Sequence, residues 1–286
     1  MSSPHPVRLG LEAPPQHCRI DELRAVWRIA DEAGFAHVWG FDHFAPIAGD
    51  VRGDVFEGWS LLAAMAVATQ RVRIGVMVTG NTYRHPGVLA KMAVTVDHLS
   101  GGRLEFGLGA AWAEVEHIML GLPFPPVGER IRRMGEALVV LKKLWTEETA
   151  DFDGRYYALR GAVAGPKPVQ RPHPPIWVGG GGEKVTLRYV ARHADVWNAG
   201  GGELETAVRK SGVLDDHCAA VGRDPGEIRR SRPVQLDPRD PAAAVEELER
   251  SVQAGFTENV VSVKSPDIRA AAEIAAADVL PRFAAG

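Results

Sequence analysis

A histidine beside a carboxylate stands directly after one of the short apolar runs of this sequence. The pair is Asp42-His43, and it follows Ala36–Phe41. An imidazole can accept or donate a proton near neutral pH, and a neighbouring carboxylate can fix its orientation or contact a ligand. The pair therefore predicts general acid–base chemistry. From local sequence alone, an Asp-His pair that caps the next helix or binds water is an equally good interpretation.

Four consecutive glycines, Gly179 to Gly182, form a second candidate site. They precede a helical pattern that begins near Glu183-Lys184. Glycines allow backbone N–H groups to approach an anion, and the N-terminus of a helix adds partial positive charge. The run therefore predicts a phosphate site, and a flexible turn is the alternative that the same residues allow.

Short apolar runs alternate with longer helical patterns along the whole chain. The predicted strands are Val7–Glu12, Ala36–Phe41, Val72–Val78, Arg103–Gly109, Pro175–Gly179, Ala194–Ala199, Ile228–Leu236 and Asn259–Val263. The first helical pattern contains Leu23, Val26, Trp27 and Ala30 and ends at Gly34, and further helices are predicted at Trp59–Thr69, Gly87–His98, Lys184–Arg192, Leu204–Val221, Ala242–Ala254 and Asp267–Val279. This alternation indicates an α/β protein, a (β/α)₈ TIM barrel.

A doubly wound open sheet is the competing architecture. It usually has fewer strands and places signature glycines after the first strand, where this sequence has none. We expect one domain over residues 1–286, because barrels of this kind commonly reach about 250 residues. The long segment between the predicted fourth and fifth strands, about residues 114–165, is interpreted as an insertion at the active end of the barrel. Its own helix has a core face of Ile131, Met134, Leu138, Leu141 and Trp145.

In a (β/α)₈ barrel the carboxyl ends of the strands converge on one mouth. Polar or glycine residues follow several predicted strands at this end: Asp42-His43, Thr79-Gly80-Asn81, Ala110-Ala111-Trp112, Gly179–Gly182 and Trp197-Asn198. Their convergence is better evidence for a site than any one of them. Glu12 and Gln16 follow the first strand and, together with Trp112 and Trp197, are the candidates for a substrate pocket.

Several segments carry a family resemblance. They are Trp39–Phe44, Tyr83–Pro86, Leu89–Met92, Asp97–Arg103, Phe106–Trp112, Glu129–Trp145 and Pro174–Gly182. In these segments the chain resembles the luciferase-like monooxygenase superfamily, and specifically its branch that uses the deazaflavin coenzyme F420. The resemblance extends from about Val7 to Asn198, with only weak motifs after that.

The resemblance implies roles for two of the candidate sites. Asp42 and His43 match an Asp-His pair that contacts the deazaflavin and supplies the proton-handling histidine. Gly180, Gly181 and Gly182 match the segment that binds the phosphate tail of the cofactor.

The resemblance also implies a support for the deazaflavin ring. Ala110 and Ala111 match a segment whose backbone lies against the ring, and the family often has Gly at the position of Ala111. Family members hold a non-proline cis peptide at the end of the third strand, which forms a bulge that props the ring. Matching the segments puts this peptide at Met77-Val78 and places Val78 and Thr79 in the cofactor site.

Composition limits the classes of partner. Lys plus Arg number 33 against 36 Asp plus Glu, a net charge of −3, so charge gives no case for a nucleic acid or an anionic membrane. Cys18 and Cys218 lie far apart without metal-ligand spacing, which argues against a disulfide framework and against structural zinc. No leader or membrane-spanning run is recognisable. We expect a soluble cytoplasmic protein with a small-molecule substrate, and a homodimer is left open.

The function that these observations predict is an F420-dependent oxidoreductase, in which His43 manages the proton while a hydride moves between the deazaflavin and a small organic substrate. An FMN-dependent monooxygenase of the same superfamily is the first alternative, because the two classes share most motifs. A barrel that binds a flavin or deazaflavin without turnover is the second. The sequence does not identify the substrate.

Overall fold

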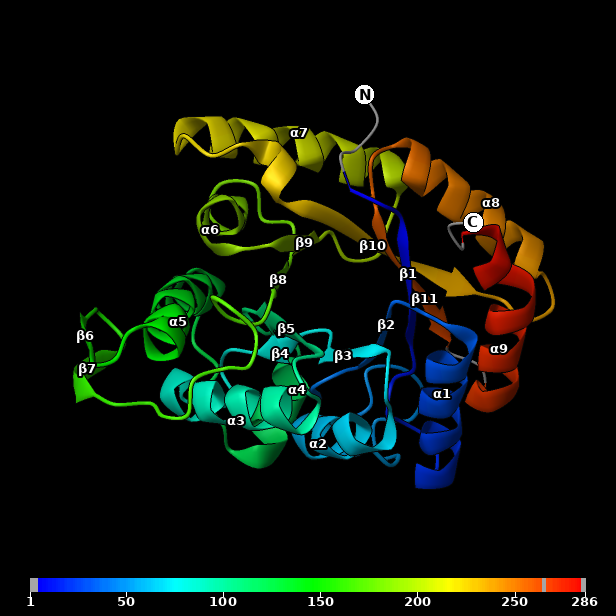
Figure 1. The fold of residues 1–286 in the computed structure, drawn as a ribbon, viewed down its shortest axis with the longest axis horizontal. Helices are drawn as coiled ribbons and strands as arrows, with labels where there is room; N and C mark the ends of the chain where they lie inside the picture. The colour runs from blue at the N-terminus through cyan, green and yellow to red at the C-terminus, as the bar shows by residue number, and fades with distance from the viewer. Residues whose placement is uncertain (1–4, 264–265, 284–286) are drawn as a thin grey trace.

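The computed structural model describes residues 5–263 and 266–283 of the chain. Within these residues, eight parallel strands close into a barrel that helices surround (Figure 1). The barrel strands are β1 (Arg8–Glu12), β2 (His37–Gly40), β3 (Arg73–Val76) with its continuation β4 (Thr79–Gly80), β5 (Leu104–Gly109), β8 (Ile176–Gly179), β9 (Val196–Asn198), β10 (Arg229–Leu236) and β11 (Glu258–Val263). Each strand pairs with the next, and β11 pairs back with β1. The predicted (β/α)₈ barrel is confirmed, and the open-sheet alternative is wrong because the ring of strands closes.

Helices cover the outside of the barrel. They are α1 (Ile20–Ala33), α2 (Gly58–Ala68), α3 (Pro86–Leu99), α5 (Val127–Thr146), α6 (Thr186–His193), α7 (Leu204–Ala220), α8 (Pro241–Gln253) and α9 (Ile268–Ile274). Their buried faces follow the helical period, as Leu23, Val26 and Trp27 do on α1. Most of the apolar core therefore lies between the strands and the helices. Inside the barrel, Trp39 and Trp177 pack edge to face.

The segment between β5 and β8 supplies one of these surrounding helices. Helix α5 packs against β5, α3 and α6, so it is the helix that follows the fourth barrel strand. The additional parts of the segment are the short helix α4 (Glu114–Leu120) and the hairpin of β6 (Ala150–Asp153) and β7 (Ala158–Ala162). In Figure 1 this hairpin lies beyond α5, away from the barrel.

The observed elements depart from the predicted bounds at several places. The predicted strand Val72–Val78 ends at Val76, because a bulge separates β3 from β4. The helix expected from Glu183-Lys184 begins at Thr186, after a turn. The predicted helix Asp267–Val279 is α-helical only to Ile274, and a π-helical segment (Ala275–Val279) and a 3₁₀ turn (Leu280–Arg282) follow it. A further 3₁₀ turn, Pro225–Glu227, precedes β10.

The bulge after β3 contains the non-proline cis peptide Met77-Val78 that the resemblance implies. Three glycines of neighbouring strands make room for the side chain of Val78. A Cβ added at Gly107, Gly109 or Gly179 would lie 3.0, 2.7 or 2.9 Å from a Val78 methyl carbon. The glycines of β5 and β8 thus leave the space that the Val78 side chain occupies, a packing role that the sequence alone did not specify.

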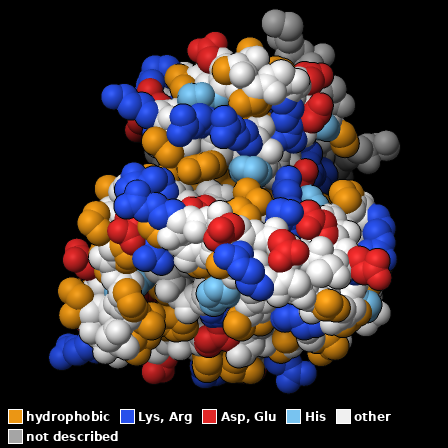
Figure 2. Space-filling model, turned by 90° about the vertical axis from the view of Figure 1, so that its left-hand side faces the viewer, with side chains coloured by type: hydrophobic (Ala, Val, Ile, Leu, Met, Phe, Trp, Pro, Cys, Tyr) orange, Lys and Arg blue, Asp and Glu red, His pale blue; other side chains and the backbone are white. Residues whose placement is uncertain are grey.

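The surface shows the mixed charge that the composition indicates, and the structure shows the state of the two cysteines. On the face drawn in Figure 2, basic and acidic side chains are interspersed. Both Cys18 and Cys218 are free thiols. Among the described residues, no helix combines the length and apolar character needed to cross a bilayer.

Candidate active site

A cavity of about 520 Å³ opens at the carboxyl ends of the barrel strands. We call it the His43 cavity. Its walls include nine of the residues proposed from the sequence: Glu12, His43, Val78, Thr79, Ala110, Ala111, Trp112, Gly180 and Gly182. Residues separated by up to 170 positions therefore meet in one space, as expected when parallel strands end at a common mouth.

Three other proposed residues lie outside the walls of this cavity. The side chain of Gln16 accepts a hydrogen bond from the Ile47 amide (2.9 Å). Trp197 is fully buried, and its indole N–H donates to the Gly180 carbonyl (2.9 Å), so it supports the glycine run from behind. Gly181 lies between two glycines that do line the cavity, and it faces α7.

Asp42 also lies outside these walls, because its carboxylate faces Arg84. The two Nη atoms of Arg84 donate to Asp42 Oδ2 and Oδ1 at 2.6 and 3.0 Å, and Arg84 also binds Glu57. Asp42 is completely buried. Asp42 thus forms a bidentate ion pair that ties the end of β2 to the segment before α3, and it is Glu116 rather than Asp42 that hydrogen-bonds to His43.

His43 is oriented by Glu116 of α4. His43 Nδ1 lies 2.9 Å from Glu116 Oε1, and the imidazole packs edge-on to Phe41 and Trp112. A carboxylate can only accept, so Nδ1 carries the proton that forms this hydrogen bond. The tautomer leaves the Nε2 atom of a neutral His43 as an acceptor, and no protein partner of Nε2 occurs among the described residues. The ring is thus held by one nitrogen and free at the other.

Glu116 is itself held firmly. It is 1% exposed, and the Phe44 amide (2.7 Å) and the Tyr83 hydroxyl both donate to it. Burial opposes its ionisation, but hydrogen bonds from His43, Tyr83 and Phe44 outweigh burial and keep the pKa of the Glu116 carboxyl below its usual value. Burial, reinforced by Glu116, raises the pKa of the Tyr83 hydroxyl. Glu116 therefore stays ionised and keeps its negative charge beside His43.

The floor of the His43 cavity is formed by small residues and by the bulge. Val78 and Thr79 come from the bulge, and Ala110 and Ala111 follow β5. Ala111 has φ of 64°, a left-handed conformation in which glycine carries no penalty. A flat ring can approach this backbone closely, since no long side chain intervenes.

The glycine run forms the other end of the cavity. Gly180 has φ of 120°, which favours glycine. A Cβ at Gly182 would lie 2.8 Å from Thr186 Oγ1, and one at Gly181 would lie 2.7 Å from Lys210 Nζ. The Thr186 hydroxyl therefore lies beside Gly182 at the cavity wall, and the Lys210 ammonium group lies beside Gly181 on the side of α7. This donor set suits a phosphate group.

These two ends together fit a flat cofactor with a phosphate tail. Among the described residues, no group of three or more His, Cys, Asp or Glu side chains is arranged to hold a metal ion. Sequence reasoning missed Glu116, Arg84 and Lys210. Glu116 follows the end of the fourth barrel strand closely, which was the available signal, but nothing local distinguished it from Glu114.

Comparison with known proteins gives the family. Residues 2–283 match the model of the family described as luciferase-like monooxygenase. The chain is 33% identical over 245 residues to the F420-dependent glucose-6-phosphate dehydrogenase of Kineococcus radiotolerans, covering 84% of this chain and 71% of that protein. It is 31% identical over 227 residues to the enzyme of the same name from Microbacterium testaceum, covering 78% of this chain and 66% of that protein.

Two solved structures have the same fold. An F420-dependent secondary alcohol dehydrogenase in complex with an F420-acetone adduct superposes with a TM-score of 0.87 at 20% identity, covering 98% of this chain and all of that chain. The coenzyme F420 dependent tetrahydromethanopterin reductase of Methanopyrus kandleri gives 0.82 at 17% identity, with the same coverage. The resemblance seen in the sequence is confirmed: the chain belongs to the luciferase-like monooxygenase family.

Proposed function

We propose that this protein is an F420-dependent oxidoreductase that moves a hydride between the deazaflavin and a small organic substrate. The observation that carries the proposal is the His43 cavity, which brings His43, the bulge at Val78 and the glycine run into one space. The relatives named as F420-dependent enzymes support the same cofactor. These relatives align over roughly two thirds of their length, so their substrate is not carried over.

The proposed cofactor contacts follow from the two ends of the cavity. Val78, Ala110 and Ala111 would lie against the ring, and the amide of Gly182 would bind the phosphate. Thr186 lines the cavity beside Gly182, and Lys210 lies beside Gly181, so their hydroxyl and ammonium groups would complete the anion site. When bound, F420 would supply or accept the hydride at its deazaflavin ring.

His43 would handle the proton at Nε2. The bond from Nδ1 to Glu116 fixes which nitrogen faces the cavity, and the negative charge of Glu116 stabilises the imidazolium that forms when Nε2 takes a proton. Phe41 and Trp112 flank the ring and limit its rotation. This arrangement supports the proposal that the proton moves at a single atom, Nε2.

Equilibrium titration of the purified protein with F420 and with FMN tests the cofactor. We expect F420 to bind in the micromolar range or tighter and FMN at least about tenfold more weakly, a difference near 1.4 kcal/mol. Equal or tighter binding of FMN would favour the monooxygenase alternative. Binding of F420 without any redox change over a broad panel of alcohols and carbonyl compounds would favour a non-catalytic binding protein.

Lys210→Met tests the anion site. Loss of the ammonium should weaken F420 binding about tenfold, while the phosphate-free deazaflavin fragment should bind wild type and variant equally. Arg209→Met is the matched control on the same helix, because its guanidinium already binds Glu183 at 2.9 Å. If Lys210→Met weakened the binding of F420 and of the phosphate-free fragment equally, Lys210 would not belong to the anion site. The same conclusion would follow if Arg209→Met weakened F420 binding as much as Lys210→Met.

A further inference from the structure

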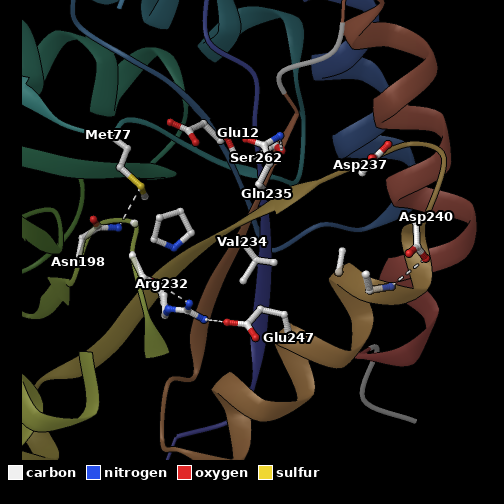
Figure 3. A pocket seen from close by; sticks show the side chains of 15 residues that line it. Glu12, Met77, Asn198, Arg232, Val234, Gln235, Asp237, Asp240, Glu247 and Ser262 are labelled. Atoms are coloured by element: carbon white, nitrogen blue, oxygen red, sulfur yellow. Dashed lines mark hydrogen bonds and ion pairs between the residues drawn. The ribbon is translucent and has the colours of Figure 1, made fainter. Parts of the chain in front are cut away.

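A second cavity of about 530 Å³ adjoins the His43 cavity (Figure 3). We call it the Arg232 cavity, and it lies by the carboxyl ends of β10 and β11 and the first turns of α8. Glu12, Met77 and Asn198 line both cavities. A molecule in the Arg232 cavity can therefore extend to the ring site.

Two buried polar atoms in the walls of this cavity lack a hydrogen-bond partner. They are Nε of Arg232, which is 5% exposed, and Oγ of Ser262, which is 3% exposed. A buried polar atom without a partner costs about 1–3 kcal/mol, so such atoms are rare in native proteins unless something else satisfies them. A ligand with oxygen atoms could satisfy both.

The positive charge of Arg232 is already compensated. Its Nη1 donates to Glu247 Oε1 (2.5 Å) and its Nη2 to the Gly202 carbonyl (2.8 Å), as Figure 3 shows for the glutamate. Only Nε–H remains as a donor, and one neutralised donor does not make a phosphate site.

The remaining charged side chains in the walls are acidic. Asp237 and Asp240 line the cavity, and Arg232 is the only Lys or Arg among its described lining residues. An anionic group would meet carboxylates without a free cation, and the desolvation of a phosphate dianion would go uncompensated. A hydroxyl or carbonyl oxygen would meet a donor at Arg232 and a donor or acceptor at Ser262.

We propose that the Arg232 cavity binds the substrate, and that this substrate is an uncharged alcohol or carbonyl compound rather than a phosphorylated sugar. The assignment of the reaction rests on the function proposed above. In the oxidative direction the carbon that bears the hydroxyl would give a hydride to bound oxidised F420, the hydroxyl would give its proton to His43 Nε2, and the alcohol would become a carbonyl compound. The reductive direction reverses each transfer.

Binding of matched neutral and phosphorylated ligands tests the charge preference. Glucose is compared with glucose 6-phosphate, and glycerol with glycerol 3-phosphate, by calorimetry on the protein with and without F420. The neutral member of at least one pair should bind at least about tenfold more tightly than its phosphorylated partner. Tighter or equal binding of the phosphorylated member, or no binding of any of the four at about 10 mM, would overturn the proposal.

Two variants test whether that charge preference arises in the Arg232 cavity. Glu247→Gln frees the guanidinium of Arg232 and should raise the affinity for the phosphorylated member about tenfold, and Ser262→Ala should weaken binding of the neutral member several-fold. Glu249→Gln is the control, since Glu249 of α8 pairs with Arg282 of the last 3₁₀ turn and not with Arg232. Equal changes in Glu247→Gln and Glu249→Gln would refute the assignment. A failure of F420 binding would refute the proposed function alone, since the ligands are also measured without cofactor.

Discussion

Strand β2 has a histidine against a glutamate at each of its two ends. At the start of the strand, His37 Nε2 lies 3.1 Å from Glu258 Oε2. Just beyond its end, His43 Nδ1 lies 2.9 Å from Glu116 Oε1. The residue types and the distances are nearly the same, but His37 is fully enclosed while His43 lines a cavity.

The two pairs differ in what holds the second ring nitrogen. The indole N–H of Trp39 donates to His37 Nδ1 (2.6 Å), so both nitrogens of His37 have protein partners and the ring is neutral. Burial lowers the pKa of His37, although Glu258 opposes this shift. Arg8 and Arg229 also bind Glu258 and complete a closed network.

The comparison teaches that a His-Glu pair is not evidence of catalysis by itself. The closed pair at the base of the barrel stabilises the fold, because each of its groups is satisfied by the protein. The open pair at the mouth leaves Nε2 without a protein partner among the described residues, as the proposed proton transfer requires. Access to the second nitrogen, rather than the distance between histidine and glutamate, separates the two pairs.

His43→Ala gives the largest expected effect and tests the open pair directly. Turnover on an identified substrate should fall by about 10²–10⁴-fold, with the fold and most cofactor affinity kept, since other strands supply those contacts. His43→Asn should not restore turnover, because an amide does not exchange a proton near neutral pH. Near-native turnover in either variant would reduce His43 to a positioning residue.

Glu258→Gln tests the closed pair. Removing one charge from this buried network should lower the free energy of unfolding by about 3–5 kcal/mol, because Arg8 and Arg229 lose their partner. Urea denaturation measures the change, and the folded variant should bind F420 as wild type does. Glu273→Gln is the control, since its exposed pair with Arg269 (3.0 Å) should contribute less than about 1 kcal/mol. An unaltered stability would show that the base network is dispensable.

Acid pH should weaken the closed pair without a mutation. Burial raises the pKa of Glu258, but hydrogen bonding to His37 and nearby arginines outweighs it and holds the value to about 2, against an ordinary 4.5. The stabilisation is therefore complete above pH 4.5 and lost as the pH falls toward 2, about 3 kcal/mol in all. The difference in unfolding free energy between wild type and Glu258→Gln should shrink over this range. A constant difference would contradict the shift.

Glu116→Gln gives the smallest expected effect and sharpens the comparison at the mouth. The amide can still accept from Phe44 N–H, but the negative charge beside His43 is lost, so kcat should fall about 10- to 100-fold. KM should change little. Steady-state kinetics separate kcat from KM, and a variant that loses stability but keeps kcat would assign Glu116 a structural role only.

The sequence by itself determined the order of strands and helices and the residues that end the strands. Apolar runs of strand length alternate with helical patterns, and this alternation depends only on local spacing, so the barrel could be predicted. The same reasoning placed His43, Ala110, Ala111 and the glycines at the mouth, because strand ends converge in any such barrel. The cis peptide at Met77-Val78 came from the family resemblance, since nothing local in Met-Val specifies it.

Only the tertiary structure decided how the side chains at the mouth pair. Asp42 is adjacent to His43 in sequence, yet it binds Arg84, while Glu116 reaches His43 across 73 positions. Trp197 turns into the core instead of the cavity. A side chain at a strand end can point inward or outward, and its choice of partner depends on which charges the neighbouring elements bring within a few ångströms. That information is absent from local spacing and appears only when the barrel closes.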